Sequence, residues 1–279
     1  RVTIVEMANL LPRDDPELVA LLRARLQDEG IAIREGAKVV AVEPKGEGVA
    51  VSIEDPTGKD RVEGSALLLA AGRQPTLDGL GLEAAGITHD RRGVTVDARL
   101  RSSNKRVFAA GDVAGGPQFT HMASYHAGIV IRNLLFRLPA KVDTRALPWV
   151  TYTDPELAQV GLTEAEARAR HGEVRVLRAP FAENDRARTE RTTDGLVKLV
   201  ATKRGKVLGA SILGPHAGEL IQPWVLAIAR NLKLSAVAQM IAPYPTLGEA
   251  NKRAAGDFYS ETLFGSRTRW LVRQLLRLP

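Results

Sequence analysis

The sequence of 279 residues contains no cysteine, so the chain itself can form no disulfide, thiolate metal site or thiol nucleophile. Aromatic residues make up only 5% of it. No apolar run reaches the roughly 18 residues that a membrane-spanning helix needs. The net charge is +7, and four arginines in the acid-free segment 266–279 supply more than half of it. The remaining charge bias is too weak to indicate nucleic acid binding.

The rest of the composition is typical of globular proteins, with 44% hydrophobic and 25% charged residues. The length predicts about two domains. The chain begins with Arg1, and residues 2–6 already have the pattern of a buried strand. We therefore expect this chain to be the C-terminal piece of a longer protein, or an incomplete reading frame.

The first half of the chain has the pattern of an α/β fold. Leu18, Leu22 and Leu26 recur at helical spacing and predict a helix over Asp15–Glu29. Short strands are predicted at residues 37–42, 49–53, 61–69, 94–96 and 107–110, a buried strand at 67–73, and a helix at 120–136.

The pattern changes beyond a boundary near Pro139–Pro148. Thr163 and Glu166 have the spacing of a capping box, which predicts a helix that starts at Thr163. The second half further predicts a strand at 149–153, three strands within 173–213, and helices near 216–230, 234–240 and 247–263.

Three segments of the first half have the features of cofactor-binding loops. Glu6 ends the first strand, where an acid can accept hydrogen bonds from an adenosine ribose, although a surface glutamate has the same pattern. Gly72 and Arg73 follow an apolar run. Gly72 would let the backbone approach a ligand closely, and Arg73 could bind the phosphate of that ligand. A simple turn is the alternative.

The third segment, 107–121, is the most specific. Gly111 would expose Asp112 at a strand end, where its carboxylate suits a polyol hydroxyl, unless Asp112 is only a helix cap. The expected helix start at Gln118, Phe119, Thr120 and His121 offers free amides and a positive dipole end. His121 and His126 stand five apart, which favours packing or hydrogen-bonding roles over a shared metal.

A fourth segment, in the second half, is a turn in which prolines flank Tyr244 on both sides and Glu249 follows one helical turn on. The fixed backbone at both prolines indicates that the direction of the ring matters. A tyrosine that packs on its own helix is the alternative.

Taken in order, these segments resemble the class I pyridine nucleotide-disulfide oxidoreductases. Residues 153–164, 194–200 and 213–221 extend the resemblance, which covers about residues 1–264. It implies an α/β fold with partial Rossmann-like FAD- and NAD(P)-binding domains followed by an α+β dimerisation domain. The implied boundaries are 1–72 for the NAD(P) part, 73–145 for the FAD segment, 146–265 for dimerisation and 266–279 for a basic amphipathic tail.

The resemblance also implies roles for individual residues. Glu6, Val39 and Gly72 match positions beside NAD, and the acid at Glu6 favours NADH over NADPH. Asp112 matches the aspartate on the FAD ribityl chain. Gln118, Phe119, Thr120 and His121 match the loop and helix start beside the flavin ring. The redox cysteine pair and the FAD glycine loop have no counterpart in this chain.

The sequence departs from the thiol-handling members of that family at one position. Where they carry a catalytic His-Pro pair oriented by a glutamate, this chain has Tyr244 and Glu249. A phenol, with a pKa near 10, cannot readily take a proton from a thiol at pH 7. Mercuric reductases resemble this chain in carrying Tyr there. We therefore expect a mercuric-reductase-like parent that passes electrons from NAD(P)H to flavin and on to a small-molecule or metal-ion acceptor.

Two function classes stay open on the sequence. The parent is an FAD-dependent enzyme, with dihydrolipoyl dehydrogenase as the alternative; or the chain as given is an inactive dimerisation and partial cofactor-binding module. We expect a cytoplasmic homodimer, no metal site and no nucleic acid partner. In the tail, a helix would place Trp270, Leu271, Leu275 and Leu278 on one stripe. Such a helix is either solvated or packed in a dimer, and contact with a membrane surface is the alternative.

Overall fold

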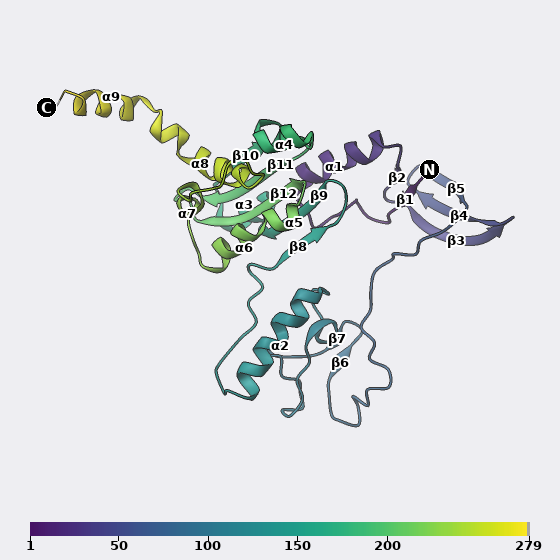
Figure 1. Ribbon diagram of the computed structural model, residues 1–279. Coiled ribbons are helices and arrows are strands. Elements are labelled where there is room, and N and C mark those ends of the chain that lie inside the picture. The colour runs from purple at the N-terminus through teal and green to yellow at the C-terminus, as the bar shows by residue number, and fades with distance from the viewer. Residues whose placement is uncertain (278–279) are drawn as a thin grey trace. The chain divides into compact units, whose positions relative to one another are not determined.

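The structure is a computed structural model that describes residues 1–277. It contains two compact units (Figure 1). Unit 1 comprises Arg1–Ala66 together with the chain from Arg145 onward, and unit 2 comprises Leu67–Thr144. These limits fall near two of the expected domain boundaries. The assignment of 1–72, 73–145, 146–265 and 266–279 to separate domains stays a prediction.

Unit 1 begins with a parallel β-α-β arrangement. Strand β1 (Thr3–Val5) pairs in parallel with β2 (Ala32–Arg34), and helix α1 (Pro16–Asp28) connects them, as a parallel pair requires. The Asp15 carboxylate caps α1 by accepting a hydrogen bond from the Glu17 amide at 3.0 Å. Pro16 is well placed in the first turn because that turn needs no amide donor. The expected strand and helix are therefore present.

A three-stranded antiparallel sheet follows, made of β3 (Lys38–Lys45), β4 (Gly48–Asp55) and β5 (Gly58–Gly64). Ala50, Val51 and Ile53 of β4 are buried, and Val51 and Ile53 lie on the same face because successive side chains of a strand point to opposite faces. The predicted third strand was too long, because β5 ends at Gly64 and not at residue 69.

The prediction of a buried strand at 67–73 was wrong. The segment has no regular structure, and Leu68 and Leu69 are 88% and 82% exposed. An apolar run forms a strand only where another strand accepts its backbone hydrogen bonds, and no strand within residues 1–277 pairs with this one.

Unit 2 contains two very short strands, β6 (His89–Asp90) and β7 (Gly93–Val94), the 3-10 helix η1 (Gly111–Ala114) and helix α2 (Thr120–Leu134). The predicted helix is present, but the predicted strand at 107–110 is reduced to a single bridge between Arg101 and Phe108. Of the strand expected at 94–96, only Val94 is in a ladder. Two small apolar clusters, one around Ile87 and one around Ile129, hold the loops together.

The rest of unit 1 is a five-stranded antiparallel sheet with helices. The sheet order is β10-β11-β12-β9-β8. Its strands are β8 (Pro148–Thr151), β9 (Glu156–Gly161), β10 (Val174–Pro180), β11 (Leu196–Thr202) and β12 (Val207–Gly214). The sequence pattern missed β9 and located the other four. The helices are α3 (Glu164–His171), η2 (Phe181–Glu183), α4 (Asp185–Glu190), α5 (Ala217–Leu220), α6 (Gln222–Ala229), α7 (Leu234–Ala238), α8 (Glu249–Leu263) and α9 (Ser266–Leu275).

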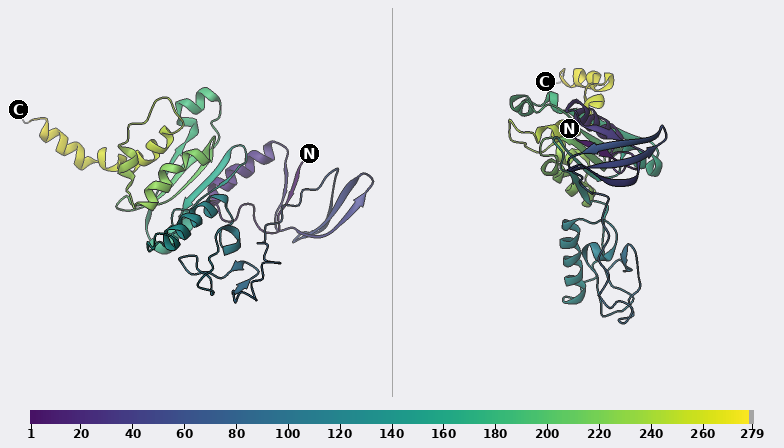
Figure 2. Two further views of the ribbon diagram at one scale, coloured as in Figure 1. Left: turned by 60° about the horizontal axis from the view of Figure 1, so that its bottom comes forward. Right: turned by 90° about the vertical axis from the view of Figure 1, so that its right-hand side faces the viewer.

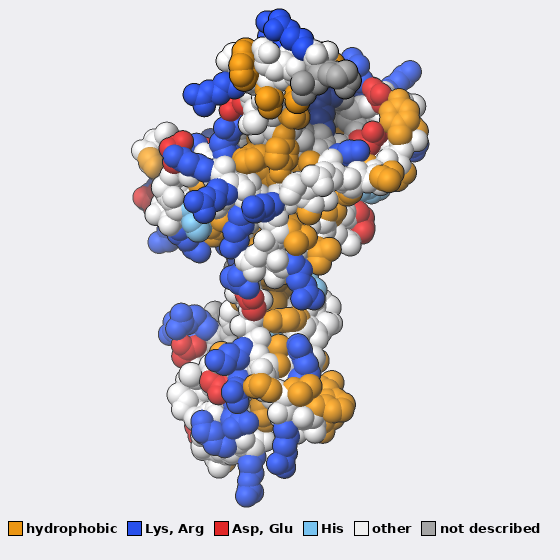
Figure 3. Space-filling model, turned by 90° about the vertical axis from the view of Figure 1, so that its left-hand side faces the viewer, with side chains coloured by type: hydrophobic (Ala, Val, Ile, Leu, Met, Phe, Trp, Pro, Cys, Tyr) orange, Lys and Arg blue, Asp and Glu red, His pale blue; other side chains and the backbone are white. Residues whose placement is uncertain are grey.

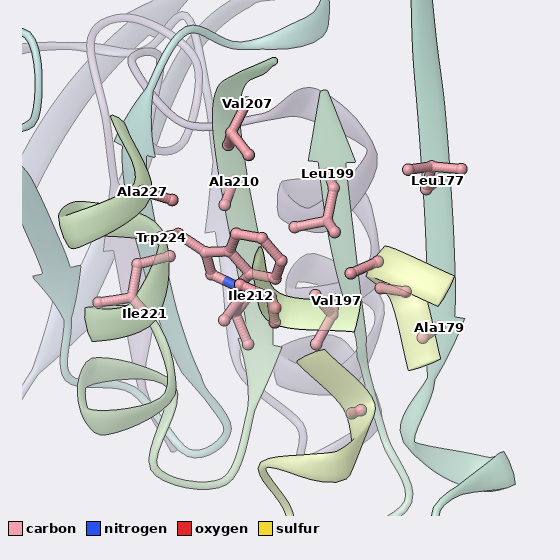
Figure 4. Close-up of a cluster of buried hydrophobic side chains, with 14 of the residues drawn as sticks. Leu177, Ala179, Val197, Leu199, Val207, Ala210, Ile212, Ile221, Trp224 and Ala227 are labelled. Atoms are coloured by element: carbon pink, nitrogen blue, oxygen red, sulfur yellow. The ribbon is translucent and has the colours of Figure 1, made fainter. Parts of the chain in front are cut away.

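The main core lies between this sheet and the helices α5 to α8. Trp224 is fully buried, and Figure 4 shows its indole beside Ala210 and Ile212 of β12. The indole Nε1 donates to Asn251 Oδ1 at 2.8 Å, so the one polar atom of the ring is satisfied inside the core. The Thr163–Glu166 capping box is formed as predicted and starts α3.

Helix α1 packs against the same five-stranded sheet. Leu18 and Leu22 are fully buried in a cluster with Leu157 of β9 and Leu213 of β12.

The C-terminal helix α9, in contrast to α1, does not pack against the sheet. Figures 1 and 2 show α9 extending beyond α8, away from the sheet of its own unit, and none of its residues is buried.

Candidate functional site

The two units carry separate groups of the residues predicted to bind cofactors. Glu6 follows β1 at the carboxyl end of the parallel strand pair, and it is half-buried. Its Oε1 accepts a hydrogen bond from the Ala8 amide at 2.9 Å, which orients the carboxylate. Its own amide donates to the Arg34 carbonyl at 2.8 Å. A carboxylate held in this way at a strand end can accept hydrogen bonds from ribose hydroxyls.

Val39 lies on β3 beside a register shift, and its side chain is 46% exposed. Gly72, at φ 99°, and Arg73 lie in the exposed segment at the start of unit 2. The structure therefore describes Glu6 and Val39 in one unit and Gly72 and Arg73 in the other.

The predicted flavin segment is built around a tight turn. Gly111 adopts φ 75°, and a Cβ there would lie 3.0 Å from the Cβ of Ala123, so only glycine fits without a shift. The Gly111 amide donates to His126 Nδ1 at 3.1 Å. His126 is 5% exposed, and burial lowers its pKa, which keeps the imidazole neutral and able to accept. The hydrogen-bonding role expected for His126 is thus present.

Asp112 follows this turn as part of η1, not at the end of a strand. Its side chain is exposed and accepts no hydrogen bond from residues 1–277. It does not cap η1 or α2, whose N-cap residues are Ala110 and Phe119. The structure thus leaves its carboxylate free to accept hydrogen bonds from hydroxyl groups of a ligand.

The start of α2 lies a few residues beyond. Phe119 is its N-cap residue and provides no side-chain cap, so the first turn keeps the partial positive charge of a helix N-terminus. The rings of Phe119 and His121 stack with centroids 5.0 Å apart. Gln118 is half-buried, and Thr120 is exposed. An exposed carboxylate and an uncapped helix start fit the polyol and the electron-accepting ring of FAD, respectively.

The predicted Tyr244 and Glu249 pair is arranged differently from a hydrogen-bonded dyad. The Tyr244 hydroxyl donates to Asp185 Oδ2 at 2.9 Å, and the ring is 70% exposed. Glu249 begins α8, and its Oε2 accepts from the Thr246 amide at 3.3 Å. Asp185 is a residue that the sequence did not suggest. Its position next to the helix-capping Asn184 is a local signal for a helix start but not for a tyrosine partner.

Asp185 also sets the protonation of the tyrosine. The hydrogen bond to its carboxylate and its negative charge raise the pKa of Tyr244, and the charge of Glu249 adds to this. The phenol therefore stays protonated at neutral pH. It can donate a proton or a hydrogen bond, and it is a poor base for a thiol.

A second charged cluster joins α1 to the five-stranded sheet. Lys198 of β11 is 3% exposed, and its Nζ lies 2.8 Å from Asp15 Oδ2, 2.8 Å from Glu17 Oε2 and 3.1 Å from Glu164 Oε2. Burial by itself lowers the pKa of Lys198, but the three carboxylates together outweigh burial and raise it. The hydrogen bond from Arg178 is the main cause that lowers the pKa of Glu17, to about 2. Every charge in this cluster has a partner, which indicates a structural role.

Among residues 1–277, no group of three or more His, Asp or Glu side chains is placed to bind a metal ion. Nor is any helix there both long and apolar enough to cross a membrane.

Comparison with known proteins agrees with these features. The family model of the pyridine nucleotide-disulphide oxidoreductases matches residues 1–127, and the model of their dimerisation domain matches residues 147–255. The chain therefore belongs to the pyridine nucleotide-disulphide oxidoreductase family. The expected family and the mixed α/β fold class are both confirmed.

Individual relatives give the same result. A mercuric reductase of Streptomyces lividans is 39% identical over 264 residues, which are 94% of this chain and 56% of that protein. A dihydrolipoyl dehydrogenase of Thermus scotoductus is 38% identical, over 94% of this chain and 58% of that protein. Among solved structures, the Cu(II) complex of the HOCl-induced flavoprotein disulfide reductase RclA from Escherichia coli matches with a TM-score of 0.85 and 32% identity, covering 92% of this chain and 58% of that one. The chain spans little more than half the length of these relatives.

Proposed function

We propose that this chain contributes the nucleotide-side acid, part of the flavin cradle and the acceptor-side tyrosine of an FAD-dependent oxidoreductase. In this enzyme, electrons would pass from NADH to the flavin and then to an acceptor. FAD, when bound, supplies the redox chemistry. Asp112 would hold hydroxyl groups of the cofactor, and the start of α2 would stabilise negative charge beside Gln118, Phe119, Thr120 and His121.

One observation carries this proposal. The exposed, unpartnered carboxylate of Asp112 follows a glycine turn that His126 holds in place, in the segment where the family model matches. A purely structural aspartate would cap a helix or pair with a cation. Asp112 does neither within residues 1–277.

The nucleotide preference is argued from Glu6. Its carboxylate follows the first strand, as an acid that binds ribose hydroxyls would, and its negative charge would repel the 2′-phosphate of NADPH. Val39, Gly72 and Arg73 would complete the nucleotide site. NADH is therefore the proposed donor, and a Glu6→Ala variant is expected to reduce the preference for NADH over NADPH.

The nature of the acceptor follows from Tyr244. A phenol kept protonated by Asp185 cannot serve as the base that thiol–disulfide exchange needs. The protein would therefore act on a small-molecule or metal-ion acceptor, like the relatives named mercuric reductase. A dihydrolipoyl dehydrogenase activity is the alternative. Glu249 would assist by keeping Tyr244 protonated rather than by a direct hydrogen bond.

The experiment measures the flavin content of the intact protein, expressed from its natural reading frame, and its NADH-dependent reduction of a dye. Asp112→Ala is expected to lose most of the bound flavin. Asp78→Ala removes another exposed acid of unit 2 and should bind FAD normally. A colourless protein, or equal flavin in both variants, would contradict the proposal. Assay of the 279-residue chain by itself tests the other candidate, an inactive dimerisation and partial cofactor-binding module, which turnover would exclude.

A homodimer is proposed from the matched dimerisation segment. Within it Ile241 is 99% exposed and Leu226 is 57% exposed, and a partner subunit would cover apolar side chains of this kind. Sedimentation at tens of micromolar should show a dimer that Ile241→Asp weakens. A monomer at that concentration would refute the dimer. A cytoplasmic location stays a prediction, which cell fractionation tests.

A membrane-surface contact of the tail is a second candidate, favoured by α9 itself. Leu271 and Leu275 are 50% and 54% exposed, and the helix carries Arg267, Arg269 and Arg273 without an acid. Such helices bind anionic lipid surfaces. Leu278, also placed in the apolar stripe, lies outside the described residues. Deleting residues 266–279 should abolish binding to anionic vesicles, and binding that persists would dismiss this role.

A further inference from the structure

Unit 2 contains a cavity that the proposed function does not use. Its volume is about 520 Å³, and five cationic side chains line it: Arg99, Arg101, Lys105, Arg106 and Arg137. No acid lines it. On the face of unit 2 in the lower half of Figure 3, Lys and Arg side chains gather around hydrophobic ones.

This cavity is separate from the Gly111–His121 segment. It includes Asn133 and Leu134 at the C-terminal end of α2, whereas His121 lies at the other end. A helix of 15 residues is roughly 20 Å long. The negative end of the helix dipole is weakened here, because Asn133 Nδ2 donates to the Ile129 carbonyl at 2.9 Å and the Leu138 amide to the Arg132 carbonyl at 2.9 Å.

The described part of the chain gives these five cations little compensating negative charge. None of them forms an ion pair with another residue of the 1–277 range. Asp97 Oδ1 accepts hydrogen bonds from the backbone amides of Arg99 and Arg101 at 2.8 and 3.0 Å. The bond from the Arg101 amide is the main cause that lowers the pKa of Asp97, and the charges of Arg101 and Lys105 add to it. By contrast, Lys198 is surrounded by three carboxylates. Like charges crowded into one cavity repel each other unless an anion joins them.

Arg101 provides an independent sign of a missing partner. Its Nε is buried and donates no hydrogen bond within the described chain. A buried donor without an acceptor costs free energy, so such atoms are rare unless a ligand or water satisfies them. Its guanidinium carbon lies 5.4 Å from the centre of the Phe108 ring, at the distance of a cation–π contact.

We propose that this cavity is a binding site for a small anion that carries two or more phosphate groups. Five positive charges exceed what one carboxylate or one phosphate monoester would neutralise. Arg101 would donate from its terminal nitrogens to one phosphate, in the paired geometry that arginine prefers. Phe108 is the aromatic side chain of the cavity lining, and Arg101 lies over one face of its ring, where a nucleobase would otherwise stack. The site therefore recognises the phosphate part of its ligand only.

Calorimetric titration of the intact protein with pyrophosphate at about 0.1 M salt tests this proposal. Arg101→Gln should weaken binding by about tenfold or more, as expected for the loss of a charge-assisted hydrogen bond. Arg91→Gln removes the same charge from an exposed position of unit 2 outside the cavity, and it should change the affinity less than about twofold. Flavin content, measured in each variant, should stay unchanged, which separates this site from the proposed cofactor site.

Four outcomes would contradict the proposal. The first is no saturable heat of binding. The second is equal weakening by Arg91→Gln and Arg101→Gln, which would indicate a diffuse charge effect. The third is equal affinity for sulfate and pyrophosphate, because a site for two phosphate groups must prefer the longer anion. Tighter binding of adenosine triphosphate than of inorganic triphosphate would refute recognition through phosphate only.

Discussion

Replacing Lys198 by methionine tests how α1 is held on the five-stranded sheet. Methionine keeps most of the length of the side chain but removes the charge. Glu17 would keep Arg178 at 2.7 Å, and Glu164 would keep Arg168 at 2.8 Å. Asp15 is 1% exposed and would lose the cation with which it is paired, so the variant leaves a buried carboxylate without an ion-pair partner among residues 1–277.

The expected loss is about 3–5 kcal/mol in the free energy of unfolding, the usual cost of removing one partner of a buried ion pair. It is measured by urea denaturation at pH 7 and one fixed protein concentration, because guanidinium is a salt that screens charges. Lys203→Met is the control. That lysine is exposed and paired with Glu173 at 2.6 Å, so its loss should cost about 0–1 kcal/mol.

The double variant Lys198→Met/Asp15→Asn separates charge from packing. Asparagine still caps α1 and carries no charge, so much of the lost stability should return. If Lys198→Met costs less than about 1 kcal/mol, or if the double variant is as unstable as the sum of the two single variants, the cation does not compensate Asp15 and the reasoning is refuted.

Three other perturbations have defined outcomes. Gly111→Ala forces a Cβ at φ 75° against Ala123, and calorimetric melting should show a loss of roughly 1–3 kcal/mol in the free energy of unfolding. The flavin content of the variant should also fall. An unchanged melting curve would contradict the tight turn. Burial holds the pKa of His126 below 6.5, so the stability that the neutral imidazole gives to unit 2 is fully present above that pH and falls as the pH drops through the lowered pKa. Amide hydrogen exchange of unit 2, measured from pH 8 to 5, should show this loss of protection. A His126→Gln variant with the same pH profile would exclude His126 as its cause. Tyr244→His in the intact protein should raise dihydrolipoamide activity by about a hundredfold, and no gain would count against the proposed control of acceptor choice.

Part of the site could be recognised from the sequence because its signals are local. The glycine before Asp112, the helix start at residue 120 and the proline-flanked Tyr244 are patterns of neighbouring residues, and the structure has the same turns and helix starts there. The partner of Tyr244 could not be recognised, because Asp185 lies 59 positions away in the chain. Nor could the cluster around Lys198, whose distance in sequence from Asp15 is 183.

The sequence by itself determined the helices and strands that have a complete local pattern, such as α1 with its Asp15 cap and α3 with its capping box. It also determined the family. Only the tertiary structure decided which apolar runs are buried and which charges are neutralised. Residues 67–69 have the pattern of a strand but lack a pairing strand, and Lys198 is charged yet buried because three carboxylates from distant elements surround it. Burial and charge compensation depend on neighbours in space, which local sequence does not contain.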